Sequence, residues 1–322
     1  MQRYRALIVI VGVAFVLRVG WMLHASPQPV SDYRVYQLLA ENLLDEQRFG
    51  LTEPTALQLP GHPWLLAGLM LVSRTVGWLS LWMVVLSTAA CAMVYLLGRR
   101  LTGREDVSLV AAAICATSPT LIVYAPVLGA EHLFVLLMLG AILAALSPGV
   151  GRPLGWALVG ALTGLAVLTR GEAVFYVPVL LGVVWIRSPD LRARVRAGGI
   201  LLAGVAVVIS PWMVRNSVVV EPGVYLSTVG GMNFYFGHNP DHYGWTRDTP
   251  WPVEDDLAAN RLGWELGLEY VRERPLSLLE SVRDGTFGLF GSPDYAYIWA
   301  TQEAGEDPVL EFSPRYVPFE NV

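Results

Sequence analysis

The sequence predicts an all-α polytopic membrane protein, with about seven transmembrane helices, interfacial helices in its first outer loop and a mixed extracytoplasmic C-terminal segment. Of its 322 residues, 54% are hydrophobic and only 15% are charged, whereas a soluble domain carries about 25% charged residues. Mean hydropathy is +0.48. Such a chain has too few charged side chains to cover a soluble globule. Two cysteines exclude a disulfide scaffold, and a net charge of −5 without a basic patch argues against nucleic-acid binding.

Seven apolar segments are long enough, or nearly long enough, to cross a bilayer. A helix needs about 20 apolar residues for this, and shorter ones cross when their flanks adapt. The fourth and sixth segments are short and can also be half-spans or re-entrant pieces. The first contains Arg18 and lacks a clear cleavage site, so we expect an uncleaved anchor. The segments are Ala6–Leu23, Val76–Leu97, Val107–Val127, His132–Leu146, Leu154–Leu168, Ala173–Ile186 and Ala197–Val214.

Arginine is distributed unevenly among the connecting segments. With the N-terminus in the cytoplasm, the cytoplasmic pieces hold ten arginines against three acids, whereas the loop 24–75 holds three arginines against five acids. Residues from Glu221 onward hold six arginines and seventeen acids. Because positively charged short loops stay in the cytoplasm, this asymmetry predicts that the first loop lies outside. We therefore expect a multi-pass protein of the plasma or inner membrane with its functional site on the outer face.

The first outer loop, residues 24–75, contains two predicted interfacial helices. Residues 33–46 place apolar and polar side chains on opposite sides at helical spacing, which is the pattern of an amphipathic helix lying on a membrane. A second apolar stretch, residues 64–72, is too short to span and follows the turn Pro60-Gly61-His62-Pro63. Two such helices would cover a cavity at the outer ends of the spans.

Asp32 lies at the start of the first of these helices, directly after Ser31. Two interpretations remain open. A carboxylate in the first turn, next to a capping serine, stabilises a helix through its dipole. The same position also holds a carboxylate rigidly at the membrane–water boundary, where a catalytic base acting on a lipid-borne substrate has to be.

Charged residues also stand at the outer ends of several predicted spans. Each has a plain interpretation, as a side chain that reaches toward the interface or as a local ion pair. Together they indicate an anion-handling site, because charges next to apolar segments are costly and often functional. The residues are Glu131 before the fourth span, Arg170 and Glu172 between the fifth and sixth, and Arg215-Asn216 at the end of the seventh.

Residues 1–216 are expected to form the transmembrane domain and residues 217–322 an extracytoplasmic segment, which we expect to stop before further spans. Within it, residues 255–274 predict an amphipathic helix that ends before Pro275. Residues 230–245 predict a polar loop that matches no closed zinc pattern. The polar residues of this loop are Asn233, His238, Asn239, Asp241 and His242.

The order of these motifs resembles that of GT-C superfamily glycosyltransferases, the group that includes dolichyl-phosphate-mannose–protein mannosyltransferases and lipid A aminoarabinose transferases. Asp32 resembles the first-loop acid of that group, although the common Asp-Glu pair is here Asp32-Tyr33. The ordered set covers roughly residues 6–290. The further motifs are Pro60-Gly61-His62-Pro63, Ala130-Glu131, Leu168-Thr169-Arg170, Pro211-Trp212-Met213-Val214-Arg215-Asn216, Gly231-Met232-Asn233 and Gly237-His238-Asn239-Pro240.

The resemblance implies a membrane glycosyltransferase that moves a sugar from a polyprenyl-monophosphate donor to an acceptor hydroxyl, with inversion. Asp32 would then be the catalytic base, and Arg215 and Arg170 would stabilise the departing phosphate, with Glu131 orienting an arginine or the sugar. The acceptor would be a protein, lipid or glycan. A divalent cation is a candidate cofactor, although the single acid of the first loop weakens the case for a metal bound by a carboxylate pair. The remaining motif residues are expected to contact substrate: His62, Asn233, His238 and Asn239.

Two other classes of function remain as alternatives. A non-catalytic subunit that binds a polyprenyl lipid would explain the lone first-loop acid and the expectation that the chain stops before the family's further spans. A transporter or flippase would place charged or broken helices near the bilayer midplane. Because the ionisable residues cluster at the outer ends of the predicted spans, the transporter is the weakest of the three hypotheses.

Overall fold

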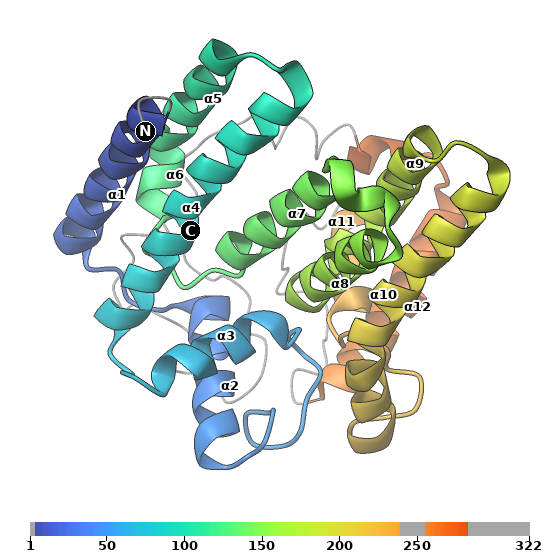
Figure 1. Ribbon diagram of the computed structural model, residues 1–322. Coiled ribbons are helices and arrows are strands. Elements are labelled where there is room, and N and C mark those ends of the chain that lie inside the picture. Colours follow the sequence, from blue (N-terminus) through green and yellow to red (C-terminus); the bar gives the residue numbers. More distant parts are fainter. Residues whose placement is uncertain (1–3, 239–254, 283–322) are drawn as a thin grey trace.

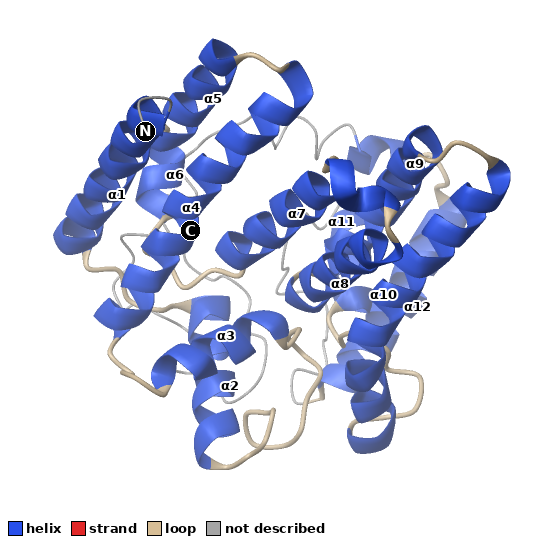
Figure 2. Ribbon diagram, in the orientation of Figure 1, coloured by secondary structure: helices blue, strands red, loops and turns tan. Residues whose placement is uncertain are grey.

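The computed structural model describes residues 4–238 and 255–282, and their regular structure is entirely helical (Figures 1 and 2). Within these ranges the only extended pairing is an isolated bridge between Gly50 and Pro54. The helices are α1 (Arg5–Ala25), α2 (Ser31–Asp45), α3 (Gly61–Met70), α4 (Val76–Thr102), α5 (Glu105–Thr117), α6 (Pro119–Tyr124), α7 (Glu131–Ala145), η2 (Pro148–Gly151), α8 (Pro153–Thr169), η3 (Gly171–Tyr176), α9 (Val177–Arg187), α10 (Leu191–Val219), α11 (Gly230–His238) and α12 (Asp256–Glu273).

Each of the seven predicted spans falls on a helix or a pair of helices. Three described helices, α1, α4 and α10, are long and apolar enough to cross a bilayer, and α7 and α8 are shorter apolar helices. The third predicted span is interrupted between α5 and α6 at Ser118-Pro119, because proline has no N–H to continue the helix. The sixth begins as the 3₁₀ helix η3 and continues as α9. The all-helical prediction is therefore confirmed, while the count of seven spans stays a prediction.

Arg18 is fully buried inside the bundle and does not reach toward the interface. Its guanidinium donates to the carbonyl oxygens of Cys115 and Ala116, each at 3.0 Å, and its Nε donates to Ser87 Oγ at 3.0 Å. The carbonyl of Cys115 would normally accept from residue 119, which is a proline. Arg18 thus supplies the donors that the break after α5 removes, and it ties α1 to α4 and α5.

The two cysteines lie side by side between α4 and α5, with 3.3 Å between their sulfur atoms. Both are free thiols. We expect a thiol oxidant such as diamide to join Cys91 and Cys115 within one chain, because only a small approach separates this geometry from a disulfide. Peptide mapping by mass spectrometry should recover the two segments as one cross-linked species. Cross-links between different chains, with none inside a chain, would contradict the packing of α4 on α5.

Glycines allow α8 and α10 to pack closely, as the spacing of Gly160 and Gly164 predicts. A Cβ atom added at Gly160 would lie 2.2 Å from the carbonyl oxygen of Leu201 and 3.0 Å from Cα of Gly204. At Gly182, on α9, an added Cβ would meet nothing within 4 Å.

We therefore expect Gly160→Ala to lower the thermal stability of the detergent-solubilised protein, at a cost of about 1–3 kcal/mol from forced backbone movement. The same substitution at Gly182 should leave stability unchanged or raise it, because alanine favours helices by about 1 kcal/mol over glycine. Thermal unfolding of both variants checks the pair. An equal change in the two would show that the close contact of α8 and α10 is absent.

The helices α2 and α3 lie at one end of the bundle, and the turns α4–α5 and α9–α10 lie at the opposite end (Figure 1). Helices at residues 33–46 and 64–72 were predicted and are observed as α2 and α3. They pack together and on the start of α4 through a buried apolar cluster. Its members are Ala40, Leu66, Ala67, Met70, Leu79, Met83 and Leu128.

The C-terminal part differs from the sequence-based expectation. The start of the predicted polar loop, residues 230–238, forms helix α11, which packs on α12. Gly231 and Gly263 make this contact possible, because a Cβ added at Gly231 would lie 1.9 Å from the carbonyl oxygen of Asn260. The Asn260 side chain also accepts from the Gly231 N–H at 2.7 Å. The described part of this segment is thus helical instead of mixed, and α12 is where the sequence predicts a helix.

Candidate active site

Asp32 lies in the first turn of α2 and its side chain is exposed to solvent. The capping position of α2 is Val30, so the serine cap inferred from the sequence is not formed there. Ser31, directly before Asp32, has a φ of 49°, a left-handed conformation that is uncommon for a residue other than glycine. The Asp32 Oδ1 atom accepts a hydrogen bond from Gln58 Nε2 at 3.1 Å. The Asp32 carboxylate is therefore accessible at the end of the bundle that carries α2 and α3 (Figure 1).

A second group of polar side chains faces Asp32 from the ends of α6, α7 and α8. Glu131, the first residue of α7, forms an ion pair with Arg170, which directly follows α8. Tyr124 donates to the other Glu131 oxygen at 2.7 Å, and Arg170 also binds Glu172 at 3.1 Å. The Glu131 and Arg170 side chains are 38% and 32% exposed. A ligand can therefore reach this ion pair from solvent.

The surroundings of Asp32 favour its protonated form. Desolvation raises the pKa of the Asp32 carboxyl most, the Glu131 carboxylate raises it further, and Arg170 opposes the shift. The residue is exposed on one side, yet enough protein surrounds the carboxyl to weaken its solvation. A carboxylate with a raised pKa is a better proton acceptor near neutral pH than an ordinary aspartate.

Arg215 binds the backbone of the loop between α2 and α3. Its guanidinium donates to the carbonyl oxygens of Thr55 at 2.6 Å and Phe49 at 2.7 Å, and it lies over the Trp212 ring. The next residue, Asn216, donates to the carbonyl oxygen of Leu226. Within residues 4–238 and 255–282, Arg215 forms no hydrogen bond or ion pair with Asp32 or Arg170, and its two backbone contacts hold residues 49–55 against α10. The role of Arg215 at the phosphate stays a prediction.

His62 is fully buried, and its Nε2 lies 2.9 Å from the carbonyl oxygen of Leu128. Its ring packs edge-on against Tyr36 at 5.1 Å. Burial lowers the pKa of His62 to about 4, so the ring is neutral at physiological pH. His62 thus fixes α3 beneath α2 and against the segment before α7, and it presents no charge to a substrate.

The remaining predicted substrate contacts lie on or beyond α11. Asn233 is exposed, whereas the His238 ring donates from Nδ1 to the Phe234 carbonyl of its own helix at 2.8 Å. Neither forms a hydrogen bond or ion pair with Asp32, Glu131 or Arg170. Asn239, Asp241 and His242 lie outside the described residues. Among the described residues, no group of three or more His, Cys, Asp or Glu side chains could hold a metal ion.

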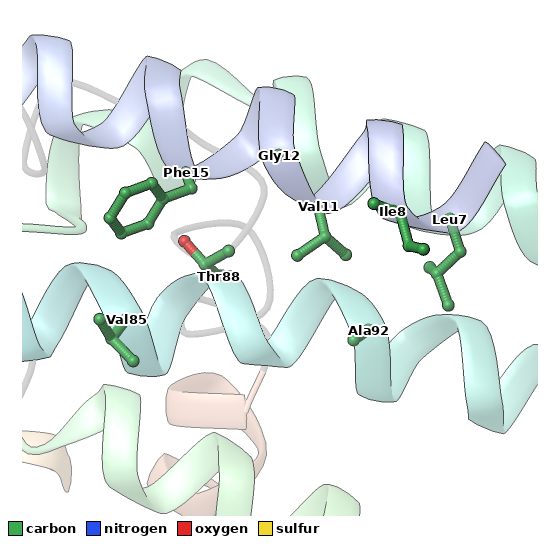
Figure 3. Close-up of a pocket in the computed structure, with 8 residues that line it drawn as sticks. All are labelled: Leu7, Ile8, Val11, Gly12, Phe15, Val85, Thr88 and Ala92. Atoms are coloured by element: carbon green, nitrogen blue, oxygen red, sulfur yellow. The ribbon is translucent and has the colours of Figure 1, made fainter. Parts of the chain in front are cut away.

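An apolar groove of about 580 Å³ lies apart from these charges, between α1 and α4 (Figure 3). Phe15, Val11 and Leu7 of α1 face Val85 and Ala92 of α4 across it (Figure 3). It is open on one side and almost entirely apolar, as a surface in contact with hydrocarbon chains should be.

Three residues of the site were not selected from the sequence: Gln58, Tyr33 and Tyr124. The Tyr33 and Tyr124 hydroxyls lie 3.1 Å apart, and Tyr124 binds Glu131, so the two tyrosines connect α2 to the ion pair. Tyr33 could have been found because it follows Asp32 directly. Gln58 and Tyr124 stand among turn and apolar residues, with no spacing that marks them.

Comparison with known proteins gives one family. The sequence profile described as dolichyl-phosphate-mannose-protein mannosyltransferase matches residues 53–214, which is half of the chain. Gln58, Glu131 and Arg170 lie inside this range. Arg215 follows its last residue directly, whereas Asp32 lies 21 residues before its first residue. No curated protein and no solved structure matches the chain.

Proposed function

Because the chain belongs to the dolichyl-phosphate-mannose-protein mannosyltransferase family, a family of multi-pass membrane glycosyltransferases that use polyprenyl-phosphate sugars, we propose that Asp32 is the catalytic base of an inverting sugar transfer. The acceptor is a hydroxyl group on a protein, lipid or glycan. The observation that carries the proposal is the accessible Asp32 carboxylate, whose pKa is raised beside the ion pair of Glu131 and Arg170.

In the proposed reaction the acceptor oxygen attacks the anomeric carbon on the side opposite the phosphate. Asp32 takes the proton of the acceptor hydroxyl as the new C–O bond forms and the bond between sugar and phosphate breaks. The products are the glycosylated acceptor and a polyprenyl phosphate. One base is sufficient because a phosphate departs without the general acid that a glycoside hydrolase needs.

Arg170 is the residue that we assign to the donor phosphate. Its side chain is partly exposed and close enough to Asp32 to influence that carboxyl. The two acids that bind Arg170, Glu131 and Glu172, orient its guanidinium. A guanidinium near a departing phosphate stabilises the charge that develops there, and more strongly where water is scarce. Arg215 supports the loop 49–55 through its two backbone contacts, and its role at the phosphate stays a prediction.

We place this site on the outer face of the plasma or inner membrane. The helices α2 and α3 and the arginine-rich turns α4–α5 and α9–α10 lie at opposite ends of the bundle (Figure 1). If the arginine-rich turns are cytoplasmic, Asp32 is extracytoplasmic. Asn233, exposed on α11, remains a candidate contact for the sugar or acceptor.

Incubation of the purified protein with a panel of polyprenyl-phosphate sugars and hydroxyl acceptors tests the function. Mass spectrometry should detect released polyprenyl phosphate together with a glycosylated acceptor. Release without a glycosylated acceptor would indicate hydrolysis instead of transfer. Saturable donor binding with neither product would favour the non-catalytic lipid-binding subunit and overturn the proposal.

A further inference from the structure

Gln58 is the one hydrogen-bond donor to the Asp32 side chain among residues 4–238 and 255–282. Its amide nitrogen lies 3.1 Å from Asp32 Oδ1, and its side chain is half-buried and uncharged. A carboxylate that can rotate freely offers its oxygens to an acceptor in many directions. A single donor on Oδ1 restricts that rotation and leaves Oδ2 for another partner.

The loop that carries Gln58 is fixed by contacts from distant parts of the chain. Arg215 of α10 binds the carbonyl oxygen of Thr55 at 2.6 Å. Asp256 of α12 accepts from the Thr55 hydroxyl at 2.7 Å. The carbonyl of the next residue, Ala56, accepts from the Thr228 N–H at 3.1 Å, and the Ala56 side chain is fully buried. Such a supporting set of contacts holds a functional side chain within a fraction of an ångström.

We propose that Gln58 is a positioning residue for Asp32, holding Oδ1 so that Oδ2 points toward the acceptor hydroxyl. This inference rests on the proposed function and deepens it, since it assigns a purpose to the contacts that Arg215 and Asp256 make with the loop. Helix α12 and the end of α10 thereby support the catalytic carboxylate indirectly, through the loop that carries Gln58.

The pH dependence of the reaction separates positioning from a general structural role. The amide of Gln58 stabilises the ionised Asp32, so its removal should raise the pKa of that carboxyl. The other titratable or charged groups that face Asp32 are Glu131 of α7, Arg170 after α8, and Tyr33 and Tyr36 of α2. All of them remain in a Gln58 variant.

The experiment compares Gln58→Leu and Gln58→Glu with the wild-type protein in the transfer assay. We expect kcat to fall about tenfold with KM nearly unchanged. The acid limb of the kcat/KM profile should move upward by about one pH unit in Gln58→Leu, and by more in Gln58→Glu because of its added negative charge. The control is Gln28→Leu, which removes an exposed amide whose hydrogen bond within the described residues goes to the Ser26 carbonyl, and it should match the wild type.

A second readout does not depend on turnover. Infrared difference titration should show the carboxyl band that Asp32→Asn abolishes, and this band should titrate at higher pH in Gln58→Leu. If Asp32 titrates at the same pH in both Gln58 variants as in the wild type, and the variants transfer sugar normally, the positioning role is overturned and the proposed function stands. If the wild-type protein transfers no sugar but the Asp32 carboxyl titrates at higher pH in Gln58→Leu, the proposed function is overturned and the contact of Gln58 with Asp32 stands.

Discussion

Replacement of Asp32 by asparagine is expected to abolish most of the sugar transfer while leaving the protein folded. Asparagine nearly matches aspartate in shape but cannot accept the proton of the acceptor hydroxyl. Removal of a general base costs about 10²–10⁴-fold in rate. Because donor binding does not need the base, the donor KM should change little. Initial rates of polyprenyl phosphate release at several donor concentrations measure both quantities.

Asp32→Asn should also change the thermal stability of the protein, and the expected direction is unusual for a polar substitution. The pKa of Asp32 is raised in the folded protein, so the ionised carboxylate is less stable there than in the unfolded chain. Its contribution to stability therefore falls as the pH rises through the folded pKa. At neutral pH, Asp32→Asn should keep or raise the melting temperature, as expected where a site is arranged for activity at the expense of stability.

The matched control is Asp45→Asn at the other end of α2. Asp45 is paired with the exposed Arg74 at 2.6 Å, and exposed ion pairs contribute little. This variant should transfer sugar at the wild-type rate. Transfer by Asp32→Asn at the wild-type rate would remove Asp32 from the mechanism. A melting temperature well below that of the wild type would instead attribute the loss to misfolding.

The helices could be predicted from the sequence because hydropathy and helical periodicity are local properties. The amphipathic pattern of residues 33–46 predicted α2, and the apolar runs predicted the helices of the bundle within a few residues. The interruption after α5 was missed, although Pro119 marks it, because a hydropathy window averages over one proline. The helix at residues 230–238 was missed because glycines in a sequence usually indicate a loop. Here the glycines are favourable because they allow α11 to pack closely on α12, which the sequence alone does not show.

Only part of the candidate site could be predicted, because position along the chain is a local property and the partner of a side chain is not. Asp32, Glu131 and Arg170 were selected by their position at the ends of apolar segments, and the structure brings these three together. Arg215 occupies the same kind of position, yet its guanidinium binds backbone carbonyls. Sequence position shows that a charge must leave the hydrocarbon, but not which partner it then finds. Gln58 was missed because an uncharged amide has no such constraint.

Replacement of Arg170 by glutamine is expected to reduce transfer about 10²–10³-fold, the usual cost of removing one preorganised group that stabilises developing charge. The variant also leaves Glu131 without its cationic partner. Since Arg170 opposes the upward shift of the Asp32 pKa, its loss should raise that pKa further. The acid limb of the kcat/KM profile should consequently move to higher pH.

Glu131→Gln provides a control of opposite sign. The Glu131 carboxylate raises the Asp32 pKa, so its neutralisation should lower that pKa and move the acid limb to lower pH. Arg170 would keep its ion pair with Glu172, and its positive charge would still lower the Asp32 pKa, which acts in the same direction. Shifts in opposite directions would place both side chains next to the base during the reaction. Equal profiles for the two variants would mean that Asp32 titrates independently of the ion pair, and Arg170 would lose its proposed place beside the phosphate.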